Sequence, residues 1–237
     1  MTKPRRYYSA EPIEGKHVVL YGSEAHHLLH VMRAAPGEHV VLFDGQGGQH
    51  DAKVVACERK TVQLTVGMRQ PDEYELPFRL TIGMPLPKGD RQRFLVDKLV
   101  ELGVSRLVPL ITARSTMKGD NRTSTKLASY VIGATKQCGR NTLMEINASL
   151  PWKQWTQQEA PCRLIAHSNG QPWGEVDLSK SEDTQIAIGP EGGLTDKELV
   201  QAVDQGWQAV ALGPRTLRME TAAIILAASV GLESSRQ

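Results

Sequence analysis

The pattern of hydrophobic and polar positions changes character near residue 70 of the chain. Before that point the apolar runs are short and typical of strands, at 17–20, 39–43, 52–56 and 62–66, and DGQGGQ (44–49) is typical of a turn. One helical stretch, SEAHHLLHVMRA, interrupts them, with Ser23 as the expected N-cap and Leu28, Val31 and Met32 on one face. This pattern predicts a small β-barrel or sheet with one helix.

A polar segment with two prolines, QPDEYELP (70–77), has the composition of a linker. After it, strands and helices are expected to alternate. The predicted strands are 78–84, 106–112, 163–167, 184–189 and 207–213. The predicted helices are 90–103 with Asp90 as cap and Gly103 as stop, 124–139 closed by Gly139, 195–206 with a Thr195–Glu198 capping box and Gly206 as stop, and one from Arg218 or Met219 to Leu232. Buried strands in this alternation predict an α/β domain with a mostly parallel sheet, and domains at 1–72 and 73–237.

Two predicted strands end in Gly-Pro, in IAIGPEGG and VALGPRTLRMETA, and a third is followed by HSNG (167–170). Ligands bind open parallel sheets at the carboxyl ends of the strands, so these loops could form one pocket. Neither loop has the GxGxxG spacing, and GxxxxGK[ST] occurs nowhere in the chain. The loops carry Glu191 in the first, and Arg215, Arg218 and Glu220 in the second. Tight βα turns are the alternative interpretation of each loop taken alone.

Composition excludes some classes of protein and leaves others open. Hydrophobic residues make up 40% and charged residues 23%, and the net charge is +2, which is ordinary for a globular protein. Residues 113–140 carry six basic side chains against one acidic. That excess suits either phosphate binding or a solvated helix face. The three cysteines form no CxxC pair, the N-terminus has no apolar core typical of a signal peptide, and no apolar run is long enough to span a bilayer. We therefore expect a cytoplasmic protein.

A histidine cluster is the only pattern that suggests a metal. His26, His27 and His30 have i,i+3 and i,i+4 spacings, but no Glu or Cys nearby completes a ligand set. A surface helix or an RNA-facing position is the expected alternative, and no metal is predicted.

Several stretches together resemble the RsmE family of 16S ribosomal RNA uridine N3-methyltransferases, in the SPOUT superfamily. They occur in the family's order and cover most of the chain: HHLLHVMRAAPGE (26–38), LFDGQG (42–47), PLPKGDRQRFLVDKLVELGVSRLVPL (85–110), KQCGR (136–140), IGPEGGLTDKE (188–198) and LGPRTLRMETA (212–222). Two positions depart from the family pattern. Lys136 stands where a glutamate is usual, and Met219 where a threonine is usual.

The resemblance implies an N-terminal PUA-like β-barrel that helps hold RNA, and a SPOUT α/β domain with a C-terminal deep trefoil knot within about 163–237. It implies a homodimer that binds S-adenosylmethionine and acts on 16S rRNA or the assembled small subunit, at a uridine of the decoding region. The cofactor-binding residues it implies are His167, Ile188, Gly189, Pro190, Gly192, Gly193, Leu212, Gly213, Leu217, Met219 and Ala222. The implied RNA-binding residues are Arg5, Arg6, Arg33, Lys88, Arg91, Arg114, Lys136 and Arg140.

Uridine N3 becomes nucleophilic only after it loses its proton, and a nearby cation stabilises the resulting anion. Arg218 is the first candidate for that cation and Arg140 the second. Glu220 or Glu191 is the expected proton acceptor, directly or through water. Two alternatives stay open. One is another SPOUT reaction, at the ribose 2′-O or at guanine N1, and the other is a non-catalytic RNA-binding or ribosome-assembly protein.

Overall fold

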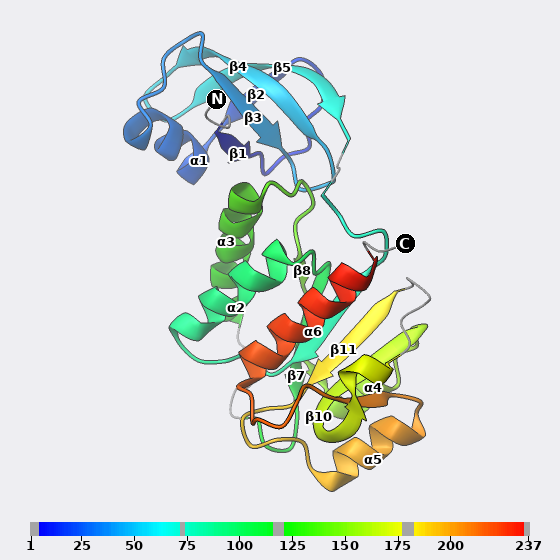
Figure 1. Cartoon of the computed structure of the whole chain (residues 1–237). Coiled ribbons are helices and arrows are strands. Elements are labelled where there is room, and N and C mark those ends of the chain that lie inside the picture. The colour runs from blue at the N-terminus through cyan, green and yellow to red at the C-terminus, as the bar shows by residue number, and fades with distance from the viewer. Residues whose placement is uncertain (1–4, 72–73, 116–120, 177–182, 235–237) are drawn as a thin grey trace. The chain divides into compact units, whose positions relative to one another are not determined.

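The computed structural model describes residues 5–71, 74–115, 121–176 and 183–234 (Figure 1). The chain forms two compact units. One is Met1–Glu75 with Thr135–Leu143, and the other is Leu76–Ala134 with Met144–Gln237. The sequence pattern placed the boundary at 72/73, close to where the first unit's main segment ends. It did not indicate that residues 135–143 return to the first unit.

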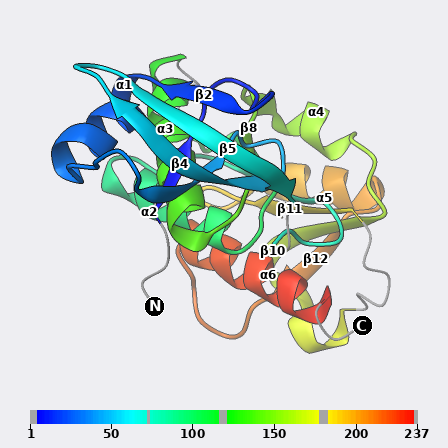
Figure 2. The ribbon, with the colours of Figure 1, turned by 90° about the horizontal axis from the view of Figure 1, so that it is seen from above.

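The first unit is built on a five-stranded sheet with the order β1-β3-β4-β5-β2. Its strands are β1 (Arg6–Tyr8), β2 (His17–Leu20), β3 (His39–Phe43), β4 (Gln49–Cys57) and β5 (Val62–Gln70). All neighbouring pairs are antiparallel except β1 and β3, and the long β4 and β5 lie side by side in Figure 2. Among the described residues no ladder joins the edge strands β1 and β2. Within these ranges, hydrogen bonding therefore leaves the sheet open between β1 and β2.

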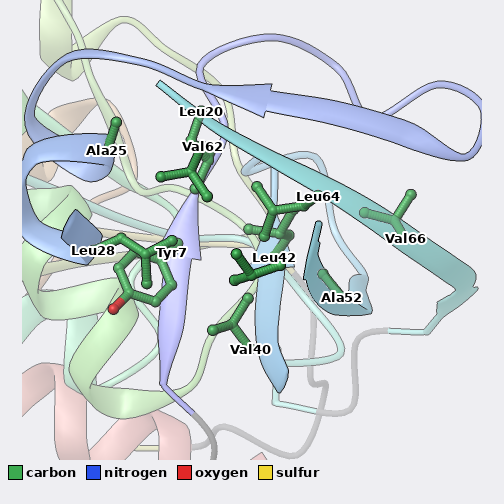
Figure 3. Packing of buried hydrophobic residues seen from close by; sticks show 11 residues of the cluster. Tyr7, Leu20, Ala25, Leu28, Val40, Leu42, Ala52, Val62, Leu64 and Val66 are labelled. Atoms are coloured by element: carbon green, nitrogen blue, oxygen red, sulfur yellow. The ribbon is translucent and has the colours of Figure 1, made fainter. Parts of the chain in front are cut away.

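One apolar cluster fills this unit, because alternate strand residues point to the same side. Figure 3 shows Tyr7, Leu20, Leu28, Leu42 and Leu64 converging from strands and helix. The predicted helix is correct in place but not in detail. It consists of α1 (Gly22–His26) and a π-helical turn η1 (His27–Val31), whose wider winding follows from the Met32 N–H donating to the His27 carbonyl at 3.0 Å.

Two predictions about this helix are wrong. The N-cap residue is Tyr21 rather than Ser23, and it makes no side-chain capping bond. Val31 is 60% exposed while Leu28 is fully buried. The π-helical turn changes the angular spacing of side chains, so an α-helical face calculated through it does not hold.

The segment 135–143 is tied to the rest of the first unit by charged contacts. The Lys136 ammonium lies 2.7 Å from Glu24, and the Arg140 guanidinium lies 2.6 Å from Glu75. Arg6 donates to the Arg140 carbonyl oxygen at 2.8 Å. These basic residues therefore hold a distant piece of chain in place.

The second unit is an α/β unit with a seven-stranded sheet in which every pair is parallel. The order is β12-β10-β11-β6-β7-β8, and β9 also pairs with β7. The strands are β6 (Leu80–Met84), β7 (Arg106–Ile111), β8 (Glu145–Ile146), β9 (Leu150–Pro151), β10 (Cys162–Pro172), β11 (Thr184–Ile188) and β12 (Gln208–Ala211). The helices that accompany them are α2 (Asp90–Glu101), α3 (Asn121–Cys138), α4 (Trp152–Thr156), the 3₁₀ turn η2 (Trp173–Glu175), α5 (Asp196–Asp204) and α6 (Met219–Ser234).

Helices cover both faces of this sheet, as its apolar strands require. On one face Trp155 of α4 and Ala202 of α5 share a core with Ala187 of β11. Side chains alternate along a strand, so Ile186 and Ile188 point to the opposite face. There α6 crosses β6 and β11 and packs beside α2 (Figure 1).

Most predicted helix boundaries are confirmed. The α5 capping box is present in both directions between Thr195 and Glu198. The helix ends where Gly206 adopts a φ of 86°, with the Trp207 N–H bonded to the Ala202 carbonyl at 3.1 Å. Gly103 and Gly139 likewise follow the ends of α2 and α3. Asp90 is not a cap, because Gly89 occupies that position and Asp90 is the first helical residue.

Candidate functional site

The candidate site lies in the second unit, at the edge of the sheet where the parallel strands end. The chain leaves β11 into 189–195 and β12 into 212–218, and these strands flank β10 on its two sides. Because the strands are all parallel, their carboxyl ends meet at one edge, as the sequence predicted for both Gly-Pro loops.

The HSNG segment is a bulge within β10 rather than the end of a strand. Ala166 and Gln171 both pair with Val210 of β12, so residues 167–170 bulge out of the ladder. A Cβ at Gly170 would lie 2.4 Å from the Val210 backbone nitrogen. The two strands therefore approach more closely here than any larger residue would allow.

A pocket of about 550 Å³ opens beside this bulge. Its lining comes from β10, η2, β12 with the loop that follows it, and α6: Ser168, Gly170, Pro172, Trp173, Ala211, Leu212, Gly213 and Ile225. Leu212 and Gly213 were predicted as ligand-binding residues, and His167 is the immediate neighbour of Ser168. Trp173 and Ile225 were missed. The signal for Trp173 was its closeness to HSNG, whereas Ile225 belongs to a helix that is apolar all round.

The loop 189–195 is held in a defined conformation. The Gly193 N–H donates to the Pro190 carbonyl at 2.8 Å, and Gly193 has a φ of 71°, which favours glycine. Arg114, predicted to bind RNA, donates from Nη1 to the Gly192 carbonyl at 2.7 Å. Glu198, beyond its capping role, accepts from the Ala113 N–H at 2.8 Å. The loop after β7 thus supports the loop after β11.

Arg91 joins the two predicted carboxylates. Its Nη2 lies 3.2 Å from Oε1 of Glu191, and its Nη1 lies 3.2 Å from Oε1 of Glu220. The exposed fractions differ greatly, at 53% for the Glu191 side chain and 6% for that of Glu220. Oε2 of Glu220 is buried and has no hydrogen-bond partner among the described residues. The two Gly-Pro loops therefore place their acids on one guanidinium.

Arg218, the first candidate for stabilising an anion, is exposed just before α6. Its backbone carbonyl accepts from the Ala222 N–H at 3.0 Å and so opens the helix. Within the described ranges its guanidinium makes no hydrogen bond or ion pair, and the residue is exposed, which leaves the charge available to a ligand.

The other predicted cofactor-binding residues fall into two groups. Ile188, Pro190, Met219 and Ala222 are buried. Gly189 and Leu217 are half-buried, and Gly192 is exposed.

The predicted RNA-binding residues are similarly divided. Arg5, Arg33 and Lys88 are exposed. Arg140 is only 3% exposed and pairs with Glu75. Because its charge does not reach the surface, Arg140 is not placed to contact RNA or to stabilise the uracil anion, contrary to both expectations. Arg6 and Lys136 make the structural contacts of the first unit described above.

Other parts of the second unit offer less chemistry. A hollow of about 630 Å³ lies at the opposite sheet edge, between the end of α4 and the start of β10, with Arg163 and Glu159 in its lining. None of the predicted site residues lies there. In the described part of the chain, His, Cys, Asp and Glu side chains nowhere gather in a group of three that could hold a metal. No helix in the same ranges is long and apolar enough to cross a membrane.

Comparison with known proteins connects both units to RNA modification. Residues 74–231 match the family profile of the RNA methyltransferase domain, and residues 20–67 match that of the RNA methyltransferase PUA domain. The chain is 28% identical over 231 residues to the ribosomal RNA small subunit methyltransferase E of Bacillus subtilis, covering 90% of this chain and 89% of that protein. Identity to the Synechocystis protein of the same name is 30% over 220 residues, covering 90% and 72%.

Solved structures agree over nearly the whole chain. A ribosomal RNA small subunit methyltransferase E from Neisseria gonorrhoeae, bound to S-adenosyl methionine, superposes with a TM-score of 0.89 at 30% identity, covering 97% of this chain and 98% of that one. A putative methyltransferase from Legionella pneumophila, in complex with the same cofactor, gives a TM-score of 0.90 at 28% identity, covering 98% of each chain.

Proposed function

Because the chain belongs to the RNA methyltransferase family that includes the ribosomal RNA small subunit methyltransferases E, we propose that it transfers a methyl group from S-adenosylmethionine to N3 of a uridine in 16S rRNA. One observation carries the proposal furthest. A pocket at the carboxyl edge of a parallel sheet lies at the loop that carries Arg218, whose guanidinium is exposed to solvent.

The residues around the pocket fit S-adenosylmethionine. Leu212, Ile225 and Trp173 give apolar surface suited to the adenine ring, and Ser168 supplies a hydroxyl. Gly213 leaves the wall without a side chain at its position, so the backbone there can approach a flat ligand. When bound, the cofactor supplies a methyl group activated by a sulfonium.

The chain's own residues then serve the uracil. Arg218 stabilises the negative charge that spreads over N3 and the two ring oxygens when the N3 proton is lost. Glu191 is exposed enough to accept that proton directly or through water. Glu220 is too deeply buried to meet substrate in this arrangement, which favours Glu191 of the two predicted acceptors.

Three finer features belong to the same proposal. We propose a deep trefoil knot within about 163–237. In support, the chain passes from β10 to β11 on one side of it and returns to β12 on the other. We further propose that the enzyme is a homodimer, and that Arg5, Arg33 and Lys88 help to hold the RNA, since all three are exposed.

The test is methyl transfer to small subunits from a strain that lacks the modification, followed by mass spectrometry of the digested nucleosides. Appearance of N3-methyluridine is the expected result. A methyl group on ribose or on guanine N1 would point to another reaction, and an absence of both transfer and cofactor binding would favour an assembly factor.

Arg218→Ala is the matching variant. We expect it to keep the fold and most of the cofactor affinity but to lose methyl transfer by ~100-fold or more, as expected for a group that stabilises developing charge. Arg106→Ala is the control, because it removes the same charge at the start of β7, from an exposed pair with Glu145. Transfer by Arg218→Ala at the control's rate would remove this residue from the mechanism.

A further inference from the structure

We propose that Arg91 is a positioning residue of the methyl-transfer site, which fixes the two Gly-Pro loops relative to each other by holding Glu191 and Glu220 at once. The inference rests on the proposed function. It replaces the expectation that Arg91 binds RNA with a role inside the protein.

The geometry of the guanidinium makes one side chain sufficient for two loops. Arg91 lies in the first turn of α2, and its two terminal nitrogens each lie 3.2 Å from a different carboxylate oxygen. Glu191 follows β11 and Glu220 opens α6, so the contacts join three segments that are distant in sequence. A planar fork with fixed nitrogen positions sets the separation of its partners, whereas a lysine ammonium offers a single compact centre.

Burial explains why Glu220 depends on this contact. Its side chain is 6% exposed, Arg91 is the counter-charge beside it, and its Oε2 has no partner among the described residues. A buried carboxylate is tolerated only with compensating charge or hydrogen bonds. Without Arg91, Glu220 would have to move toward water, and the first turn of α6 would move with it.

That movement would reach the cofactor pocket. Ile225, on the next turns of α6, lines the pocket, and so do Leu212 and Gly213 at the start of the loop that leads into α6. Arg91 is not itself among the residues that line this pocket. Its effect on the cofactor is therefore expected to pass through Glu220.

Calorimetry of S-adenosylmethionine binding to the full chain tests this without any RNA. We expect Arg91→Ala to weaken binding about tenfold, because small displacements in a preorganised site weaken the interactions that it makes. Arg91→Lys keeps the positive charge but concentrates it on a single ammonium. Its cofactor affinity should therefore fall between those of Arg91→Ala and wild type. The matched control is Arg93→Ala on the same helix, whose ion-pair partner Asp97 lies in α2 itself. It should bind like wild type.

A double-mutant cycle separates positioning from general destabilisation. Glu220→Gln removes the buried charge that Arg91 compensates. In that background Arg91→Ala should therefore cost little further cofactor affinity, so the losses of the two single variants should not add. The double variant also removes the unpaired charge, so it remains folded if Arg91→Ala alone does not. Additive losses would overturn the proposal.

The RNA alternative and the proposed function are separable outcomes. If Arg91→Ala binds cofactor like Arg93→Ala but binds small subunits more weakly, Arg91 contacts RNA and the positioning role is wrong. If the wild type binds cofactor but forms no N3-methyluridine, the proposed substrate fails while the cofactor measurements on Arg91 still stand.

Discussion

Adding one methyl group at Gly170 tests the close approach of β10 and β12. An alanine Cβ there would lie 2.4 Å from the Val210 nitrogen and 2.5 Å from the Ala209 carbonyl carbon. Both neighbours are backbone atoms in a paired strand, so no side-chain rotation relieves the overlap. One of the two strands must shift.

The cost follows from that rigidity. Overpacking typically costs 1–3 kcal/mol, and a clash with backbone belongs at the upper end, about 3 kcal/mol. For a chain of this size each kcal/mol lowers the melting temperature by roughly 2–4 °C, so Gly170→Ala should melt ~6–12 °C lower. Because β12 leads directly into Leu212 and Gly213, the same shift should weaken cofactor binding.

Gly174→Ala is the matched control. It lies in η2, four positions along the chain, and an added Cβ meets no atom within 4 Å. Differential scanning calorimetry and cofactor titration of both variants give the comparison. If Gly170→Ala melts and binds like Gly174→Ala, the strands do not approach as described, and the assignment of the bulge to the pocket wall fails with it.

Three further outcomes are expected. Glu75→Ala removes the carboxylate beside the buried Arg140, and should lower the free energy of unfolding by ~2–3 kcal/mol in a urea titration. The control Glu145→Ala removes the acid of an exposed pair, and should lower the same free energy by only ~0.5 kcal/mol. Cofactor binding should change tryptophan emission in wild type but not in Trp173→Phe, because Trp173 lines the pocket; an equal change in both would place the ligand elsewhere. Burial raises the pKa of the Cys162 thiol, which leaves less thiolate at neutral pH, so iodoacetamide should alkylate it slowly until the chain unfolds, as peptide mass spectrometry would show.

Local signals in the sequence predicted much of the second unit. The capping box at Thr195 and the glycine at 206 act through bonds only a few residues apart, so their effect is visible in the chain itself. Short elements without a periodic pattern were not predicted. Among them are β1, β8 and β9, which contain only two or three residues each. Their existence depends on pairing with distant strands, which no local pattern encodes.

The residues of the candidate site likewise divide into those that local sequence signals predict and those that they do not. Residues that the chain must place at strand ends, such as Leu212 and Gly213, could be predicted from the loops. The partners of the charged residues could not. Arg91 and Arg140 look alike in the sequence, yet one bridges two loops near the surface and the other is buried against Glu75. Only the tertiary arrangement decides which acid an arginine meets.

The return of residues 135–143 to the first unit has a consequence during synthesis. Domains generally fold as units while the chain emerges from the ribosome. Here Glu24 and Glu75 precede their basic partners, Lys136 and Arg140, by a long stretch of chain. The N-terminal unit can therefore be completed only after residue 143 has left the exit tunnel. Until then Glu24 and Glu75 have no Lys136 or Arg140 to pair with. The first strands and helix of the second unit are already synthesised by that time.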